Sequence, residues 1–239
     1  MPGWKQALHR HYRNAYGLGL ASYNIIERWA PVHLVPRAFL PKHMHASGWR
    51  HFAVMVVYTA TLFGILATAP LYSSTSAVTA IVLGMLVPFY LWMMLFAFTV
   101  YVQHTDKRMP WFDPKIDKPK GLPMESLSTH IEFPKILKAL MHNVYDHAVH
   151  HVNVRIPYHK AAAAQKTLNE MAPDTAVVQN FTFGWLHETL RDCRLYDFEN
   201  HRWLAWDGTP TSGSTVAPQI RETIRQPKSK TSGAVAAAV

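Results

Sequence analysis

Hydrophobic residues are concentrated in one long stretch of the chain. From His51 to Thr105, 55 residues follow one another without a single aspartate, glutamate, lysine or arginine. A membrane-spanning helix needs about 20 apolar residues, so this stretch has room for two. We expect the first span at 52–69, a short polar turn at 70–76 and the second span at 77–102. A buried helix pair of a soluble protein is the alternative, but such helices are usually shorter and carry charges on one face.

A proline and the flanking charges predict the shape and the orientation of this helical hairpin. Pro88 lies inside the second span and predicts a kink there. Cytoplasmic flanks of membrane helices are enriched in lysine and arginine, so basic flanks place both ends, and both chain termini, in the cytosol. The predicted fold is all-α: a multi-pass protein of the inner (cytoplasmic) membrane with one transmembrane helical hairpin plus cytosolic and interfacial helices. The basic residues that flank the hairpin are Arg37, Lys42, Arg50, Lys107 and Arg108.

Outside the hairpin, apolar residues recur at helical spacing in three places. The segment 16–29 is flanked by aromatic and basic residues, which predicts either a membrane-surface helix or an ordinary core-facing helix. Helical periodicity is also present over 128–154 and 159–171. We therefore expect four regions: a basic interfacial region at 1–50, the hairpin at 51–105, a cytosolic metal-binding helical cap at 106–207, and a disordered tail at 208–239, which is rich in Gly, Ser, Thr, Pro and Lys.

The overall composition narrows the classes of partner. The net charge is +9 with neutral histidines, which suits anionic lipid surfaces, acidic partners or nucleic acid. No basic run is interleaved with aromatic residues in a known nucleic-acid motif, so we set nucleic acid aside. The single cysteine, Cys193, allows no disulfide within the chain and fits a reducing compartment.

The strongest chemical signal is the motif His147-x-x-His150-His151. On a helix these three imidazoles lie within one quadrant, because residues three and four apart share a face. Imidazole is the commonest metal ligand, and nitrogen-rich sites suit zinc, copper or iron. A polar histidine cluster on a solvated face is the alternative. Asp146 and Asn153 are candidates to hold the second ring nitrogens.

Other histidines are weaker candidates. His104 ends the second predicted span and leaves the membrane on the same side as the cluster, so it can supply a fourth ligand. We expect His130 to be a surface residue, and His187 and His201 to be structural. His142 lies off the shared helical face.

These residues carry a resemblance to a known family. The motif, followed by Val152-Asn153-Val154-Arg155-Ile156-Pro157-Tyr158, resembles the last histidine box of membrane fatty acid desaturases. Tyr101-Val102-Gln103-His104-Thr105 is similar to the segment that precedes that box and supplies an extra iron ligand. Cys193-Arg194-Leu195-Tyr196-Asp197 is similar to the family's C-terminal segment. The nearest subgroup is the bacterial and plastid omega-6 (delta-12) acyl-lipid desaturases.

The resemblance implies a di-iron enzyme. Its iron centre would use O2 to introduce a cis double bond into an acyl chain, with electrons from a ferredoxin or cytochrome-type carrier. The expected partners are thus a membrane lipid or acyl substrate and an electron-transfer protein. The implied iron ligands are His104, His147, His150 and His151, with Asp146 as a supporting residue, and no catalytic residue is expected beyond the ligands.

The family's two earlier boxes, HxxxH or HxxxxH and then HxxHH, have no counterpart in this chain. The chain therefore resembles the C-terminal half of a desaturase. We expect either a desaturase or a C-terminal half that needs the remainder in trans. Two alternatives stay open. One is another histidine-box oxygenase, such as a carotenoid hydroxylase or ketolase, and the other is an inactive membrane remnant.

Overall fold

A computed structural model describes residues 2–13, 18–34, 36, 40–113, 122–216, 221, 224 and 235–237. The described chain is mostly helical and separates into two compact units. One unit combines Met1–Ala15 with Thr99–Val239, and the other is Tyr16–Phe98. The boundary near residue 98 falls inside a continuous helix, α6 (Val87–Gln103).

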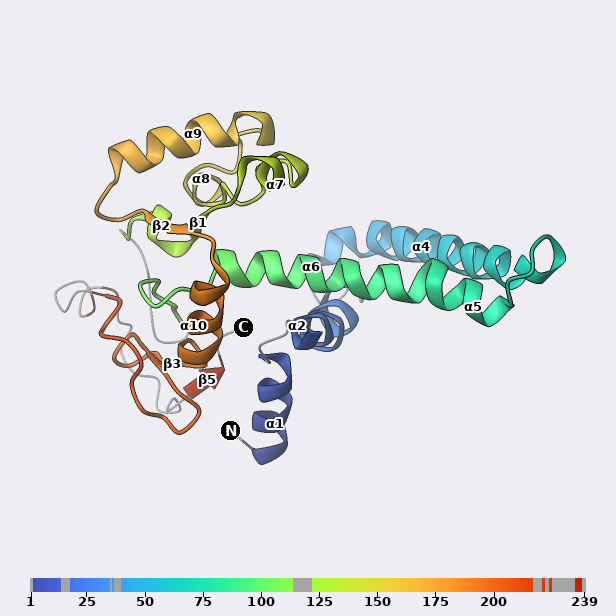
Figure 1. The fold of residues 1–239 in the computed structure, drawn as a ribbon, viewed down its shortest axis with the longest axis horizontal. Helices are drawn as coiled ribbons and strands as arrows, with labels where there is room; N and C mark the ends of the chain where they lie inside the picture. Colours follow the sequence, from blue (N-terminus) through green and yellow to red (C-terminus); the bar gives the residue numbers. More distant parts are fainter. Residues whose placement is uncertain are drawn as a thin grey trace. The chain divides into compact units, whose positions relative to one another are not determined.

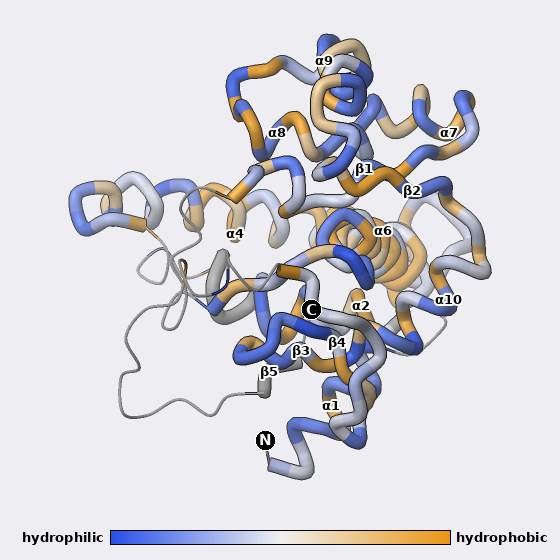
Figure 2. The backbone as a smooth tube through the Cα atoms, turned by 90° about the vertical axis from the view of Figure 1, so that its left-hand side faces the viewer, coloured by the Kyte–Doolittle hydropathy of each residue, from blue (hydrophilic) through white to orange (hydrophobic). Residues whose placement is uncertain are grey.

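The unit Tyr16–Phe98 contains the first of the two apolar helices that the sequence predicts and most of the second. Lys42–Leu71 and Ala77–Gln103 are each long and apolar enough to cross a membrane, and little of either is buried. Figure 2 shows the continuous hydrophobic colouring of α6. The component helices, drawn in Figure 1, are η2 (Lys42–Met44), α4 (His45–Ala67), η3 (Ala69–Leu71), α5 (Ala77–Ile81), the π-helical turn η4 (Val82–Leu86) and α6.

Local chemistry explains how these helices turn and pack. Ser76 caps α5 because its hydroxyl accepts a hydrogen bond from the amide of Thr79, at 3.1 Å. A Cβ atom at Gly84 would lie 3.0 Å from Leu66 Cδ2, so a glycine permits the close approach of the two helices. The π-helical turn η4 lies at the predicted kink near Pro88. A proline ring clashes with the carbonyl four residues earlier in an α-helix, and a wider turn relieves that clash.

The first helices of this unit fall in the segment predicted to be either interfacial or core-facing. They are α2 (Leu18–Tyr23) and the π-helix η1 (Asn24–His33). Leu20, Ala21 and Asn24 are buried. The amide of Asn24 lies 3.3 Å from the sulfur of Met93. These contacts favour the core-facing alternative for this segment.

The other unit is built from short helices and short strands. The parallel pair β1 (Thr129–Glu132) and β2 (Val177–Asn180) has the register Thr129 opposite Val177 and Glu132 opposite Asn180. A second sheet has the order β4-β3-β5, all antiparallel. The remaining elements are α1 (Gly3–Tyr12), η5 (Met124–Leu127), α7 (Lys135–Leu140), α8 (Ala148–Val152), α9 (Tyr158–Met171), α10 (Phe183–Asp192), β3 (Leu195–Asp197), β4 (Arg202–Leu204) and β5 (Val235–Ala237).

Two expectations about secondary structure need correction. The all-α prediction is right for most of the chain, but this unit also contains the strands just described. The prediction of one helix over 128–154 is wrong. Its first residues form β1, because they pair with β2, and α7 starts only after Pro134. His142 and Asn143 then adopt positive φ angles of 49° and 56°, which no helix accommodates, so α8 is a separate helix.

An aromatic cluster forms the core beside β3 and β4. Cys193, Tyr196 and Trp203 are fully buried there, and Phe198 and Trp111 pack against them. Burial raises the pKa of the Cys193 thiol, so this side chain stays protonated and acts as a small apolar residue.

The segment after β4 continues this packing. The Thr211 amide donates to the carbonyl of Trp203 at 2.9 Å, the Thr215 amide donates to that of His201 at 2.7 Å, and Val216 is buried. The predicted disordered tail, 208–239, lies mostly outside the described residues.

Candidate metal centre

His104 is the first residue after α6 and enters the site with a defined tautomer. Its Nδ1 atom lies 3.3 Å from the carbonyl oxygen of Leu127. A carbonyl can only accept a hydrogen bond, so Nδ1 carries the proton and the neutral ring has its lone pair on Nε2. The Trp111 indole donates to the His104 carbonyl at 2.9 Å and holds the backbone as well.

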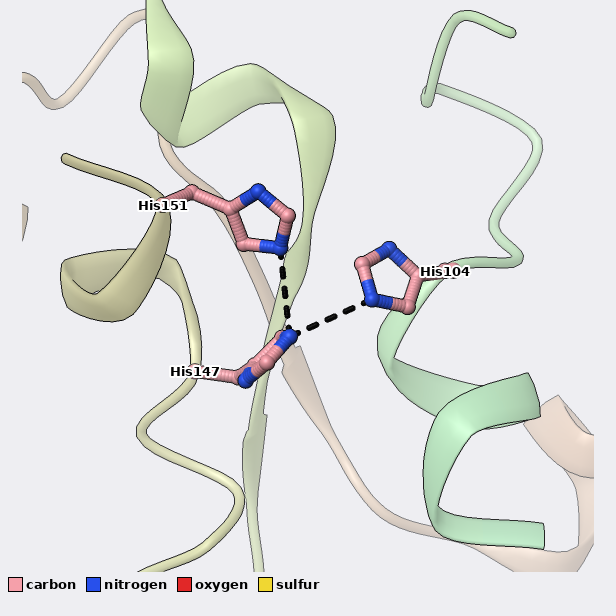
Figure 3. Close-up of side chains that lie close together, drawn as sticks. All are labelled: His104, His147 and His151. Atoms are coloured by element: carbon pink, nitrogen blue, oxygen red, sulfur yellow. Dashed lines mark hydrogen bonds between the residues drawn. The ribbon is translucent and has the colours of Figure 1, made fainter. Parts of the chain in front are cut away.

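His147 and His151 bring two further Nε2 atoms to the same point. His147 immediately precedes α8 with helical backbone angles, and His151 follows four residues later, so both rings lie on one side of this short helix. The Nε2 atom of His147 lies 3.2 Å from that of His104 and 3.1 Å from that of His151 (Figure 3). The three potential ligand atoms all lie within 4.8 Å of one another. We call His104, His147 and His151 the histidine trio.

Hydrogen bonds between neutral rings cannot account for both short contacts of His147. His147 faces two other ring nitrogens through a single Nε2 atom, and that atom can donate at most one proton. Imidazole nitrogens bound tetrahedrally to one ion lie roughly 3.4 Å apart, given metal–nitrogen bonds of about 2.1 Å. Two of the three separations are close to this value and the third is within 4.8 Å, so the trio is a candidate site for a shared cation.

The electrostatics of the trio favour uncharged rings. Burial, followed by the neighbouring rings of His104, His151 and His150, lowers the pKa of His147 to about 3. Burial, and then His150, lowers the pKa of His151. The rings of His147 and His151 are therefore neutral at pH 7, which is the form that binds metal.

His150 is the fourth predicted ligand and lies outside the trio. Its ring stacks beside that of His147, with centroids 5.4 Å apart and planes inclined by 26°, and the residue is exposed. The i, i+3 spacing thus keeps His150 beside the site, but its nitrogens do not join the three that converge.

Asp146, the predicted supporting residue, faces a different partner set. Its fully buried carboxylate lies 2.8 Å from Lys138 Nζ and 3.3 Å from His130 Nδ1. His130 Nε2 in turn lies 2.6 Å from the carboxylate of Glu132. We call His130, Glu132, Lys138 and Asp146 the acid–base cluster. Asp146 therefore anchors the chain just before His147 through Lys138 and His130, and it does not hold a ring nitrogen of the trio.

The expectation of a surface position for His130 is wrong. Only 1% of its side chain is exposed, because β1 is buried by pairing with β2 and the acid–base cluster encloses the ring. The alternation His130-x-Glu132 on a strand was a usable signal, since such residues face the same side. Asn153, the other residue considered as a supporting group, accepts instead from the amide of Arg155 at 3.0 Å.

Sequence reasoning missed the residues that join the end of α6 to the His147 segment. The side-chain amide of Gln103 donates to the backbone carbonyl of Val144 at 2.6 Å. The Ser128 hydroxyl donates to the backbone carbonyl of Gln103 at 3.2 Å. The hydroxyl groups of Thr99 and Tyr145 lie 3.4 Å apart. These bonds bring His104 and His147, 43 residues apart, into contact. The adjacency of Gln103 to His104 was the only cue in the sequence.

Comparison with known proteins gives one partial relationship. No protein-family model matches the chain. The chain is 25% identical over 142 residues to a protein of Spinacia oleracea, "Omega-6 fatty acid desaturase, chloroplastic". The match covers 59% of this chain and 29% of that protein, so the chain corresponds to under a third of its relative's length. The finding supports a desaturase-like relationship, suggests an oxidoreductase and, with the two apolar helices, suggests membrane association.

Proposed function

We propose that this chain is the C-terminal part of a membrane fatty acid desaturase that introduces a cis double bond into an acyl chain. The observation that carries the proposal is the convergence of three imidazole nitrogens within 4.8 Å. The partial similarity to a desaturase and the two apolar helices agree with it. The proposal places the chain in the inner membrane, with both ends of the helical hairpin on the cytosolic side.

Iron is the metal that the donor set and the chemistry favour together. Imidazole nitrogen suits iron as well as zinc or copper. An unactivated methylene offers no acidic proton to a general base, so its dehydrogenation needs a redox metal. An iron pair supplied with O2 and electrons provides an oxidant of that strength. His104, His147 and His151 would hold iron, and His150, which lies outside the trio, is a predicted further ligand.

The protein's own groups keep the site ready for metal. The Leu127 carbonyl orients the His104 ring, and burial keeps His147 unprotonated. The acid–base cluster fixes the backbone just before His147 through Asp146. The remaining ligands of a di-iron centre would come from the N-terminal half, supplied in trans. Electrons would come from a ferredoxin or cytochrome-type protein, which is acidic enough to suit a chain of charge +9.

Iron content and lipid products test the proposal together. The chain is co-expressed with a desaturase N-terminal half that carries the two earlier histidine boxes, purified in detergent, and analysed for iron by mass spectrometry. We expect roughly two irons per chain, as a nitrogen-ligated iron pair requires, and new dienoic acids in the host lipids. His151→Ala should abolish both, whereas His187→Ala, which removes an exposed histidine from α10, should change neither.

The outcomes separate the competing functions. Iron together with hydroxylated or ketolated ring products would identify a carotenoid oxygenase and contradict the desaturase assignment. Protein that folds with its partner but holds no iron would identify a membrane remnant.

A further inference from the structure

A cavity in the unit of residues 1–15 and 99–239 gathers three arginines around one tryptophan. It has a volume of about 380 Å³. Arg10 belongs to the last turn of α1, Arg191 to the last turn of α10, and Trp206 follows β4, so three separate segments build it. We call this the arginine pocket, and its lining residues are Arg10, Arg191, Arg194, Ala205, Trp206 and Asp207.

Two of the guanidinium groups share one aromatic ring. The Cζ atoms of Arg10 and Arg194 each lie 5.7 Å from the centre of a Trp206 ring. Each contact is a cation–π attraction of a common kind. Two cations beside one ring raise the positive potential of the pocket, and an anion bound in the pocket would lower that potential.

The nearby carboxylates are already engaged by other groups. Asp192 binds Arg191 through both oxygens, at 2.6 and 2.9 Å, and also pairs with Lys107. Asp207 lines the pocket, but its Oδ1 atom accepts from the amide and hydroxyl of Thr209 in its own turn, at 2.9 and 2.6 Å.

Asp207 still carries one negative charge, which offsets only one of the two guanidinium charges of Arg10 and Arg194. Within the described part of the chain, neither forms an ion pair with a carboxylate. Arg194 uses only Nε, which donates to the Arg191 carbonyl at 2.9 Å, and so its two terminal nitrogens are free to bind a ligand. The pocket thus combines a surplus of positive charge with donors that have the planar fork geometry of guanidinium.

We propose that the arginine pocket binds a phosphate group. Planar guanidinium groups match the oxygen geometry of phosphate and bind it through paired hydrogen bonds. The phosphate belongs either to a phospholipid headgroup or to a small soluble phosphate. The proposal concerns the arginine pocket alone and does not depend on iron or on desaturation.

The test measures thermal stability of the full chain in detergent micelles at constant ionic strength. A ligand that binds only the folded chain raises the melting temperature in proportion to its occupancy. The two anionic probes are inorganic phosphate and short-chain phosphatidic acid. Short-chain phosphatidylcholine and chloride serve as the blanks. We expect stabilisation by at least one of the two anionic phosphates. The double substitution Arg10→Gln/Arg194→Gln should raise the concentration for half-maximal stabilisation at least about tenfold, because it removes two charge-assisted donors.

A matched control removes the same charge elsewhere. Arg155→Gln/Lys166→Gln changes two exposed cations outside the pocket and should leave the half-maximal concentration within about twofold, as expected for screened surface charges. Stabilisation by inorganic phosphate would identify a soluble ligand, and stabilisation by phosphatidic acid alone would identify a headgroup. Either result supports the proposal.

Two results would overturn it: no stabilisation by either anionic phosphate, or an equal loss of phosphate binding in the control pair. If the double glutamine variant does not fold, Arg10→Lys/Arg194→Lys keeps the charge but removes the fork. Weaker phosphate binding by that variant supports the arginine pocket, and unchanged binding opposes it.

Discussion

The histidine trio and the acid–base cluster are neighbours in sequence, because Asp146 of the cluster directly precedes His147 of the trio. They differ in charge: the cluster contains both cations and anions, whereas the trio contains only imidazoles. The cluster places Lys138 between two carboxylates, so its cation pairs with anions inside the cluster. The trio contains three imidazoles and no carboxylate, and burial lowers the pKa of His147 to about 3. Ion pairs inside the cluster offset the cost of burying its charges. The ring lone pairs of the trio have no cation of their own and are suited to an added one.

The largest effect on stability is expected from removing the lysine cation of the acid–base cluster. Lys138→Met leaves the Asp146 carboxylate buried without its cation, and breaking a buried pair costs about 3–5 kcal/mol. We expect a loss of that size in the free energy of unfolding, measured by circular dichroism in denaturant with the chain in detergent. Lys166→Met is the control, because Lys166 is 81% exposed and its contact with Glu170 is 4.0 Å long. A loss within about 0.5 kcal/mol in both variants would show that the pair does not stabilise the fold.

Metal affinity should distinguish the trio from the fourth predicted ligand. With cobalt(II) as a spectroscopic probe, we expect His151→Ala to weaken binding by the chain alone about 100-fold or more, because one of three ligands is lost. His150→Ala removes a ring that stacks beside His147 but does not converge with the trio, and should weaken binding much less. Equal losses in the two variants would show that His150 is a full member of the chain's own site.

The smallest effect concerns acid stability of the cluster. Burial opposes ionisation of Glu132, but hydrogen bonds and charges from His130 and Lys138 outweigh it and lower the pKa of this carboxyl group. A carboxyl group with a lowered folded-state pKa stabilises the fold above its ordinary pKa and loses that contribution as the pH falls below about 4.3. Glu132→Gln should therefore reduce the acid-induced loss of stability, measured by denaturation at pH 6 and at pH 3. The same acid sensitivity in the variant would contradict the role of Glu132.

Sequence patterns predicted the two regions unequally. His147 and His151 could be grouped because helix geometry alone relates residues four apart. The uncharged stretch predicted two long apolar helices. The position of His130 could not be predicted, since its burial depends on β1 pairing with β2, 48 residues further along the chain. The same non-local pairing, with the positive φ angles of His142 and Asn143, replaced the expected long helix by a strand and two short helices.

The sequence by itself determined the features that depend on neighbouring residues: where apolar helices form, how the histidine motif is spaced, and how basic the chain is. Only the tertiary structure decided which groups meet. His104 joins His147 because Gln103 and Ser128 tie the end of α6 to distant segments, and Asp146 turns towards Lys138 and His130. The physical reason is that periodicity fixes directions along one element, whereas contacts between elements depend on packing and on hydrogen bonds between residues far apart in sequence.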